Sequence, residues 1–105
     1  MTKSVYSATR FENFSKDFEL KNQIIRASTS SMHNIAEGFD GGSNLEFVRF
    51  LRYAQRSCTE VKSQLYVAID QNYITTEHFQ SLYAEAYLTH KKIGGFIKYL
   101  ISAKE

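Results

Sequence analysis

The stretch from Asn44 to Asp70, NLEFVRFLRYAQRSCTEVKSQLYVAID, decides the fold of this chain. Its apolar residues recur every three or four positions along the whole stretch, which is the spacing of one face of an α-helix. The residues on this face are Phe47, Phe50, Leu51, Ala54, Cys58, Val61, Leu65, Ala68 and Ile69. The preceding Ser43, followed three residues later by Glu46, has the pattern of a capping box. The sequence therefore predicts one long amphipathic helix over residues 44–70.

The same apolar spacing outside this stretch predicts three more helices. Two of them are long, over residues 16–39 and 76–102, and one is short, over residues 4–12. We expect Ser15 and either Thr75 or Thr76 to be N-caps, the glycine-containing segment 38–42 to end the second helix, and residues 71–74 to form the next break. Short turns between long helices make consecutive helices antiparallel. We therefore predict an all-α, up-and-down antiparallel four-helix bundle with a shortened first helix, forming one domain over residues 1–105.

The composition agrees with a helical domain and excludes several classes of protein. The chain has 105 residues with no proline and five glycines, and its β-branched residues do not alternate with polar ones, so β-rich folds are disfavoured. A single cysteine excludes an internal disulfide and favours a reducing compartment. No apolar run approaches the length of a bilayer, and the first residues lack the apolar core of a signal peptide. We expect a cytoplasmic protein with no role at a membrane.

Three arginines and one tyrosine of the central helix are candidates for binding nucleic acid. Arg49, Arg52 and Arg56 lie three and four residues apart, so a helix brings them within a sector of about 60° on the side opposite its apolar face. Guanidinium groups bind phosphates, and Tyr53 beside them offers a ring on which a base can stack. The alternative is a solvated face in which Glu46 and Glu60 pair with the outer arginines. The net charge of +2 is lower than that of a dedicated nucleic-acid binder and favours this alternative.

The last helix contains three residues that point to a helix–helix or subunit contact. The helical phase of His90 places it between Ala86 and Ile93 on the apolar face, so we expect a buried or interface histidine. Gly94 and Gly95 each cost about 1 kcal/mol relative to alanine inside a helix. Close approach of another helix, in the bundle or in a second subunit, is the simplest compensation.

No group of residues in the sequence predicts catalysis or metal binding. Cys58 lies on an apolar face, where an inert buried thiol is more frequent than a nucleophile. The acidic residues lack a convergent partner for acid–base chemistry, and the three histidines lack the spacing of metal ligands. We therefore expect a protein that is not an enzyme and needs neither a metal nor a cofactor.

Several short blocks occur in an order that is similar to a known family. They are Asn34-Ile35-Ala36-Glu37-Gly38, Gly42-Ser43, Glu46-Phe47, Phe50-Leu51 and Gly95-Phe96-Ile97-Lys98-Tyr99-Leu100. With these blocks the chain resembles the four-helix-bundle family encoded in intervening sequences of bacterial 23S ribosomal RNA genes. The resemblance implies a ring-like homopentamer. More distant relatives are accessory proteins of diversity-generating retroelements, which are basic pentamers associated with a reverse transcriptase and nucleic acid.

The resemblance also implies roles for the residues of the first block. Asn34 and Glu37 are expected to form hydrogen bonds between helices or between subunits, and Gly38 matches the glycine that ends the second helix in the family. The chain departs from the family pattern at its beginning, where it lacks most of the family's first helix. Either the true start of the chain lies further upstream, or the protein has an uncovered groove between the second and fourth helices, which favours association or partial disorder. We expect oligomerisation, because an exposed apolar groove is a liability in a monomer.

Two functions follow as hypotheses. The leading one is an oligomeric, non-enzymatic bundle whose basic helix face contacts RNA, DNA or an enzyme that acts on nucleic acid. The alternative is a protein-interaction or structural module with no nucleic-acid role.

Overall fold

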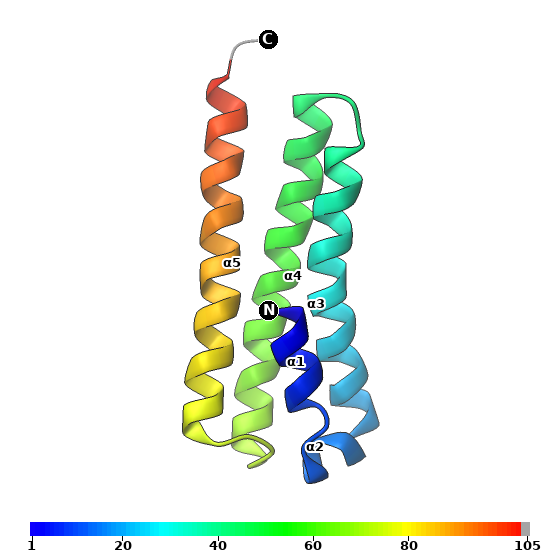
Figure 1. The fold of residues 1–105 in the computed structure, drawn as a ribbon, viewed down its shortest axis with the longest axis vertical. Coiled ribbons are helices and arrows are strands. Elements are labelled where there is room, and N and C mark those ends of the chain that lie inside the picture. The colour runs from blue at the N-terminus through cyan, green and yellow to red at the C-terminus, as the bar shows by residue number, and fades with distance from the viewer. Residues whose placement is uncertain (104–105) are drawn as a thin grey trace.

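The computed structural model describes residues 1–103 and consists of three long helices and two short ones (Figure 1). The long helices are α3 (Phe18–Phe39), α4 (Asn44–Asp70) and α5 (Thr76–Ser102). They run antiparallel in sequence order, with α4 between α3 and α5. The short helices α1 (Thr2–Ala8) and α2 (Glu12–Lys16) together take the fourth position of the bundle. The all-α fold with a shortened first helix is thereby confirmed.

The central helix α4 begins and ends where its sequence pattern predicts. The Ser43 hydroxyl accepts a hydrogen bond from the Glu46 backbone N–H at 3.1 Å, which is the first half of the predicted capping box. The Glu46 carboxylate instead binds Arg49. The buried face of α4 contains Leu51, Ala54, Cys58, Val61, Leu65 and Ala68. The helix is the central element because it packs against both of the other long helices.

The N-terminus of α3 differs from the prediction. Asp17, not Ser15, is the N-cap, and its carboxylate accepts from the Leu20 N–H at 3.0 Å. Its other carboxylate oxygen accepts from the Tyr73 hydroxyl at 2.9 Å, and this hydrogen bond raises the pKa of Tyr73. Because Tyr73 follows α4, this bond holds the start of α3 against the turn between α4 and α5. Ser15 does not cap α3 because it lies inside α2, where its hydroxyl donates to the Glu12 carbonyl at 2.7 Å.

The predicted helix over residues 4–12 was wrong in its bounds. The chain forms α1, breaks at residues 9–11 and forms α2, which extends past the predicted end at residue 12. Phe14 is completely buried and stacks on Tyr73, with ring centroids 5.5 Å apart. Burial of this ring explains why a short helix forms there despite its polar neighbours.

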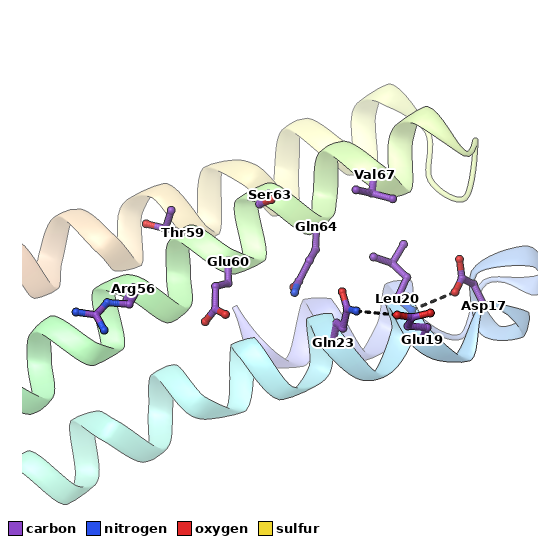
Figure 2. A pocket seen from close by; sticks show the side chains of 10 residues that line it. All are labelled: Asp17, Glu19, Leu20, Gln23, Arg56, Thr59, Glu60, Ser63, Gln64 and Val67. Atoms are coloured by element: carbon purple, nitrogen blue, oxygen red, sulfur yellow. Dashed lines mark hydrogen bonds between the residues drawn. The ribbon is translucent and has the colours of Figure 1, made fainter.

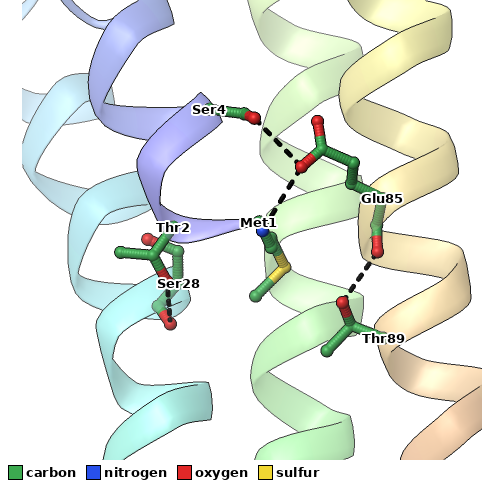
Figure 3. A network of polar contacts seen from close by, with 6 residues as sticks. All are labelled: Met1, Thr2, Ser4, Ser28, Glu85 and Thr89. Atoms are coloured by element: carbon green, nitrogen blue, oxygen red, sulfur yellow. Dashed lines mark hydrogen bonds and ion pairs between the residues drawn. The ribbon is translucent and has the colours of Figure 1, made fainter.

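A small polar network attaches α1 to the two helices beside it (Figure 3). The Met1 amino group lies 3.3 Å from Glu85 Oε1 of α5, and the Ser4 hydroxyl donates to the same oxygen at 2.9 Å. The Thr2 hydroxyl donates to the Ser28 carbonyl of α3 at 3.4 Å. This network lies near the middle of the bundle, where α1 begins.

The core divides into two clusters along the bundle. One surrounds Phe14, Ile24 and Leu65 at the end covered by α1 and α2, and the other surrounds Leu51, Cys58 and Ile97 toward the α3–α4 turn. Beyond Met1, toward the α3–α4 turn, α1 and α2 no longer cover the bundle, and the described chain has only α3, α4 and α5 there (Figure 1). This uncovered part contains a series of contacting rings that we call the aromatic row. Its members are Phe39, Phe47, Phe96 and Tyr99, with consecutive centroids 6.0, 5.2 and 6.1 Å apart.

Candidate nucleic-acid interface

The three predicted arginines lie together on the outside of α4. Arg49, Arg52 and Arg56 are all exposed, and the buried positions Ala54, Cys58 and Val61 belong to the opposite side of the helix. We call these arginines with Tyr53 the arginine ridge. The helical spacing predicted this grouping correctly because α4 is regular along its full length.

Tyr53 lies between two of the guanidinium groups. The Cζ atom of Arg56 is 5.6 Å from the centre of its ring and that of Arg49 is 6.0 Å away. The ring also makes an edge contact with Phe50 at 5.9 Å. Tyr53 remains 37% exposed, so a flat aromatic surface with cations on two sides faces solvent.

The arginines of the ridge differ in their acidic partners. Arg49 forms a two-point ion pair with Glu46, with Nε to Oε1 at 2.8 Å and a second nitrogen to Oε2 at 3.0 Å. Within residues 1–103, no ion pair forms on Arg52 or Arg56, and the alternative pairing of Arg56 with Glu60 is not present. Arg52 and Arg56 therefore present two charges that no carboxylate of the described chain neutralises.

Two grooves border the ridge. On one side Arg52 lines an apolar groove between the start of α4 and the end of α5, formed with Val48, Leu45, Leu100 and Ile101. On the other side Arg56 lines a polar groove between α3 and α4 (Figure 2). Neither groove can be predicted from the spacing of residues in one helix, because each one needs residues from two helices.

The polar groove contains one polar atom without a partner. The side-chain oxygen of Gln64 is buried and accepts no hydrogen bond from any described residue. Gln23, Thr59, Glu60 and Ser63 line the same groove (Figure 2). An unpartnered buried carbonyl is costly, and its position in a groove lets water or a ligand donor satisfy it.

In the described chain, the side chains of Asn34 and Glu37, from the first block of the family pattern, bind residues of their own helix α3. The Asn34 amide donates to the Ser30 carbonyl at 2.9 Å and to the Ser30 hydroxyl at 3.1 Å, and Glu37 lies 3.5 Å from His33. The expected direct bonds between helices are therefore not made. Asn34 reaches α4 only indirectly, because the Ser30 hydroxyl accepts from Ser57 at 3.1 Å. A role of Asn34 and Glu37 between subunits stays a prediction.

Gly38 has a different role from the one predicted. It lies inside α3, which ends one residue later, and the positive φ of this turn belongs to Gly42 at 84°. A Cβ at Gly38 would lie 2.8 Å from Phe47 Cδ1 and 2.9 Å from Phe50 Cβ. Gly38 is therefore needed for the close approach of α3 and α4, and not for the helix exit.

The predicted contact residues of α5 divide between the bundle and solvent. His90 is half-buried, and burial followed by the charge of Lys62 lowers its pKa. Its carbonyl accepts from the Gln55 amide at 3.3 Å, and the same amide nitrogen would lie 3.0 Å from a Cβ at Gly94. Gly94 thus has the close approach of α4 that we expected, whereas a Cβ at Gly95 would meet nothing within 4 Å. A subunit contact at Gly95 stays a prediction.

The remaining chemistry-bearing residues are separate from the ridge. Cys58 is completely buried, its Sγ lies 3.4 Å from the Ser31 hydroxyl, and burial raises the pKa of its thiol. Among residues 1–103, no three His, Cys, Asp or Glu side chains come together as a metal site. None of the helices in that range combines the length and apolar character required to cross a bilayer.

Comparisons with known proteins place the chain in a family. The model of the 23S rRNA-intervening sequence protein family matches residues 1–95. A crystal structure of a protein with unknown function from the S23 ribosomal protein family of Bacteroides thetaiotaomicron VPI-5482 has 28% sequence identity and a TM-score of 0.83. The match covers 91% of this chain and 89% of that one. No curated protein matches the sequence. The chain therefore belongs to the 23S rRNA-intervening sequence protein family.

Proposed function

We propose that this chain is a non-enzymatic, homo-oligomeric bundle that binds RNA or DNA, or an enzyme that acts on them, through the arginine ridge. The observation that carries the proposal is the exposed pair Arg52 and Arg56, which lacks an acidic partner among the described residues and lies beside the Tyr53 ring. Phosphates attract such guanidinium groups and bases stack on such a ring. The family name, which refers to ribosomal RNA, makes RNA the first ligand to test.

The resemblance adds a homopentameric assembly to this proposal, and the single cysteine and the lack of an apolar signal core add a cytoplasmic location. A homopentamer in the cytoplasm would repeat the ridge five times around a ring. Repetition raises the effective affinity for a long nucleic acid without any new contact, because later binding events become intramolecular.

Light scattering with and without a mixed RNA pool, at low and moderate salt, tests the proposal. We expect the particle to gain mass with RNA and to lose it as salt increases, because phosphate contacts release counterions. The variant Arg52→Glu/Arg56→Glu should lose binding while keeping its circular-dichroism spectrum. Lys3→Glu/Arg10→Glu is the matched control, since both residues are exposed, lie on the first part of the chain and change the charge equally. Binding that persists in the ridge variant, or is indifferent to salt, contradicts the proposal.

The alternative function is a protein-interaction or structural module. It is favoured by the aromatic row, in which Phe39 is 74% and Tyr99 66% exposed although no residue of the described chain covers them. A protein partner that copurifies after nuclease treatment, together with no binding of RNA, would select this alternative.

A further inference from the structure

A second group of rings and cations lies on the outer side of α4 and α5, away from α1. We call it the tyrosine–lysine surface and define it as Lys62 and Tyr66 of α4 with Phe79, Tyr83 and Tyr87 of α5. The Lys62 amino group is 5.8 Å from the centre of the Tyr83 ring and 5.9 Å from that of Tyr87. Tyr66 contacts Phe79 at 5.2 Å and Tyr83 at 5.7 Å.

The rings of this surface are arranged in two levels. Phe79 and Tyr83 are partly buried and pack on the core, whereas Tyr66 is 54% and Tyr87 51% exposed. The inner rings support the outer ones, with Phe79 and Tyr83 5.5 Å apart. Packing on the inner rings therefore holds Tyr66 in place, and the contact with Lys62 positions Tyr87, so less ordering is needed when a ligand binds.

The charge around these rings is positive. Helical spacing places Lys91 and Lys98 on the side of α5 that carries Tyr83, Tyr87 and Gly94, and both lysines are exposed. Of the acidic residues near these rings in sequence, Glu85 binds Met1 and Ser4 on the α1 side and Glu60 lines the polar groove toward α3. Asp70 and Glu77 are exposed at the end of α4 and the start of α5. No ion pair of residues 1–103 includes Lys62, Lys91 or Lys98.

The tyrosine–lysine surface continues the arginine ridge along α4. Lys62 follows Arg56 by six residues, which is about 9 Å of helix. Six residues also rotate the position by about 120° around the helix axis, so only a flexible strand that crosses from one face of α4 to the next can contact both surfaces.

We infer that the tyrosine–lysine surface binds unpaired nucleotides, so that the ligand is a single-stranded nucleic acid whose bases stack on Tyr66 and Tyr87. The inference rests on the proposed function, which it deepens by selecting single strands over duplexes. Bases of a duplex already stack on their neighbours and present no face to a protein ring, whereas unpaired bases do. The aromatic row differs in this respect, because no cation–ring contact accompanies its rings in residues 1–103.

The test compares one labelled RNA in two forms. A mixed-sequence 15-nucleotide RNA with a fluorescent end label is titrated by anisotropy as a single strand and as a blunt duplex with its complement. We expect the full-length protein to bind the single strand more tightly. The variant Tyr66→Leu/Tyr87→Leu keeps apolar side chains but removes both rings, and it should weaken single-strand binding by about tenfold or more. Its affinity for the duplex should not change.

The control and a second measurement separate the outcomes. Tyr6→Leu/Phe18→Leu removes two exposed rings outside both the tyrosine–lysine surface and the aromatic row, and it should bind the single strand like the unmodified protein. Because the chain has seven tyrosines and no tryptophan, its emission reports tyrosines directly, and stacking should quench it more with the single strand than with the duplex. Photocrosslinking of the unmodified protein to a 4-thiouridine RNA should modify peptides within residues 62–66 and 83–87, even if the double variant fails to fold.

Each result decides between the two proposals. An unmodified protein that binds neither RNA form overturns the proposed function and this inference together. Equal affinity for strand and duplex, unchanged in Tyr66→Leu/Tyr87→Leu, overturns only this inference and leaves the ridge as a binder of phosphates. Crosslinks confined to the arginine ridge would likewise overturn only this inference.

Discussion

At the scale of single residues, Gly38 shows how one missing Cβ fixes the distance between two helices. Gly38→Ala should destabilise the protein by about 1–3 kcal/mol, because the added methyl group overlaps Phe47 and the Phe50 Cβ. Gly95→Ala in α5 is the matched control, because a Cβ there meets nothing within 4 Å. This substitution should stabilise the protein by up to about 1 kcal/mol. Urea denaturation measures both. Equal effects of the two substitutions would show that helix propensity, not packing, decides the cost at Gly38.

His90 gives a prediction for the dependence of stability on pH. Burial lowers its pKa below the ordinary value of 6.5, so the unfolded chain binds a proton more readily than the folded chain. The free energy of unfolding should therefore fall as the pH decreases from about 6.5 through the folded pKa, and His90→Gln should remove this part of the decrease. Denaturation at several pH values between 5 and 7.5 measures it. If the free energy of unfolding changes equally with pH in the unmodified protein and in His90→Gln, the prediction is contradicted.

The sequence predicted single residues correctly where one regular helix decides their position. Arg49, Arg52 and Arg56 are exposed together because their spacing matches the turn of α4, and Cys58 is buried for the same reason. The sequence pattern assigned Gly38 to the helix exit and did not predict its packing, because the atoms that require a glycine there come from a different helix. The sequence could not predict that the buried side-chain oxygen of Gln64 lacks a hydrogen-bond partner, because this depends on how α3 and α4 face each other.

At the scale of elements, the caps give the sharpest prediction. Thr75→Ala removes the hydrogen bond from the His78 N–H and an exposed contact with His78 Nδ1, and it should cost about 1 kcal/mol. Asp17→Ala removes the bond to Leu20 and also leaves the Tyr73 hydroxyl without its acceptor, so it should cost clearly more. Thermal unfolding of the two variants compares them directly. If Asp17→Ala is no worse than Thr75→Ala, the bond between Asp17 and Tyr73 does not contribute to stability.

Whether a contact lies within one helix or joins distant segments also explains which elements the sequence predicted correctly. The bounds 44–70 and 76–102 agree with α4 and α5, whose long apolar faces and threonine or serine caps act within one helix. The first part of the chain was predicted as one helix and forms two, because the burial of Phe14 against Tyr73 is a contact between distant segments. Local pattern therefore decides the long helices, and tertiary packing decides the short ones.

At the scale of the whole molecule, the shape argues for assembly. The chain is 50 × 21 × 17 Å with a radius of gyration of 15.0 Å, whereas a compact domain of this length has about 13 Å. The half of the bundle beyond Met1 has three helices at most, so Phe39 and Tyr99 of the aromatic row stay largely exposed. An elongated bundle with an uncovered apolar side gains more from lateral association than a compact one does.

Two aromatic surfaces then compete for the role of subunit contact, and one pair of variants separates them. We propose that the aromatic row is covered by another copy of the chain, whereas the tyrosine–lysine surface stays free for nucleic acid because its lysines would repel a second cationic copy. Light scattering should therefore give a particle larger than a monomer for the unmodified protein and for Tyr66→Ser/Tyr87→Ser. Phe39→Ser/Tyr99→Ser should give a smaller particle at the same concentration, with its helical circular-dichroism signal retained. The reverse result would move the contact to the tyrosine–lysine surface, and a monomer for the unmodified protein would mean that the short first helix prevents assembly.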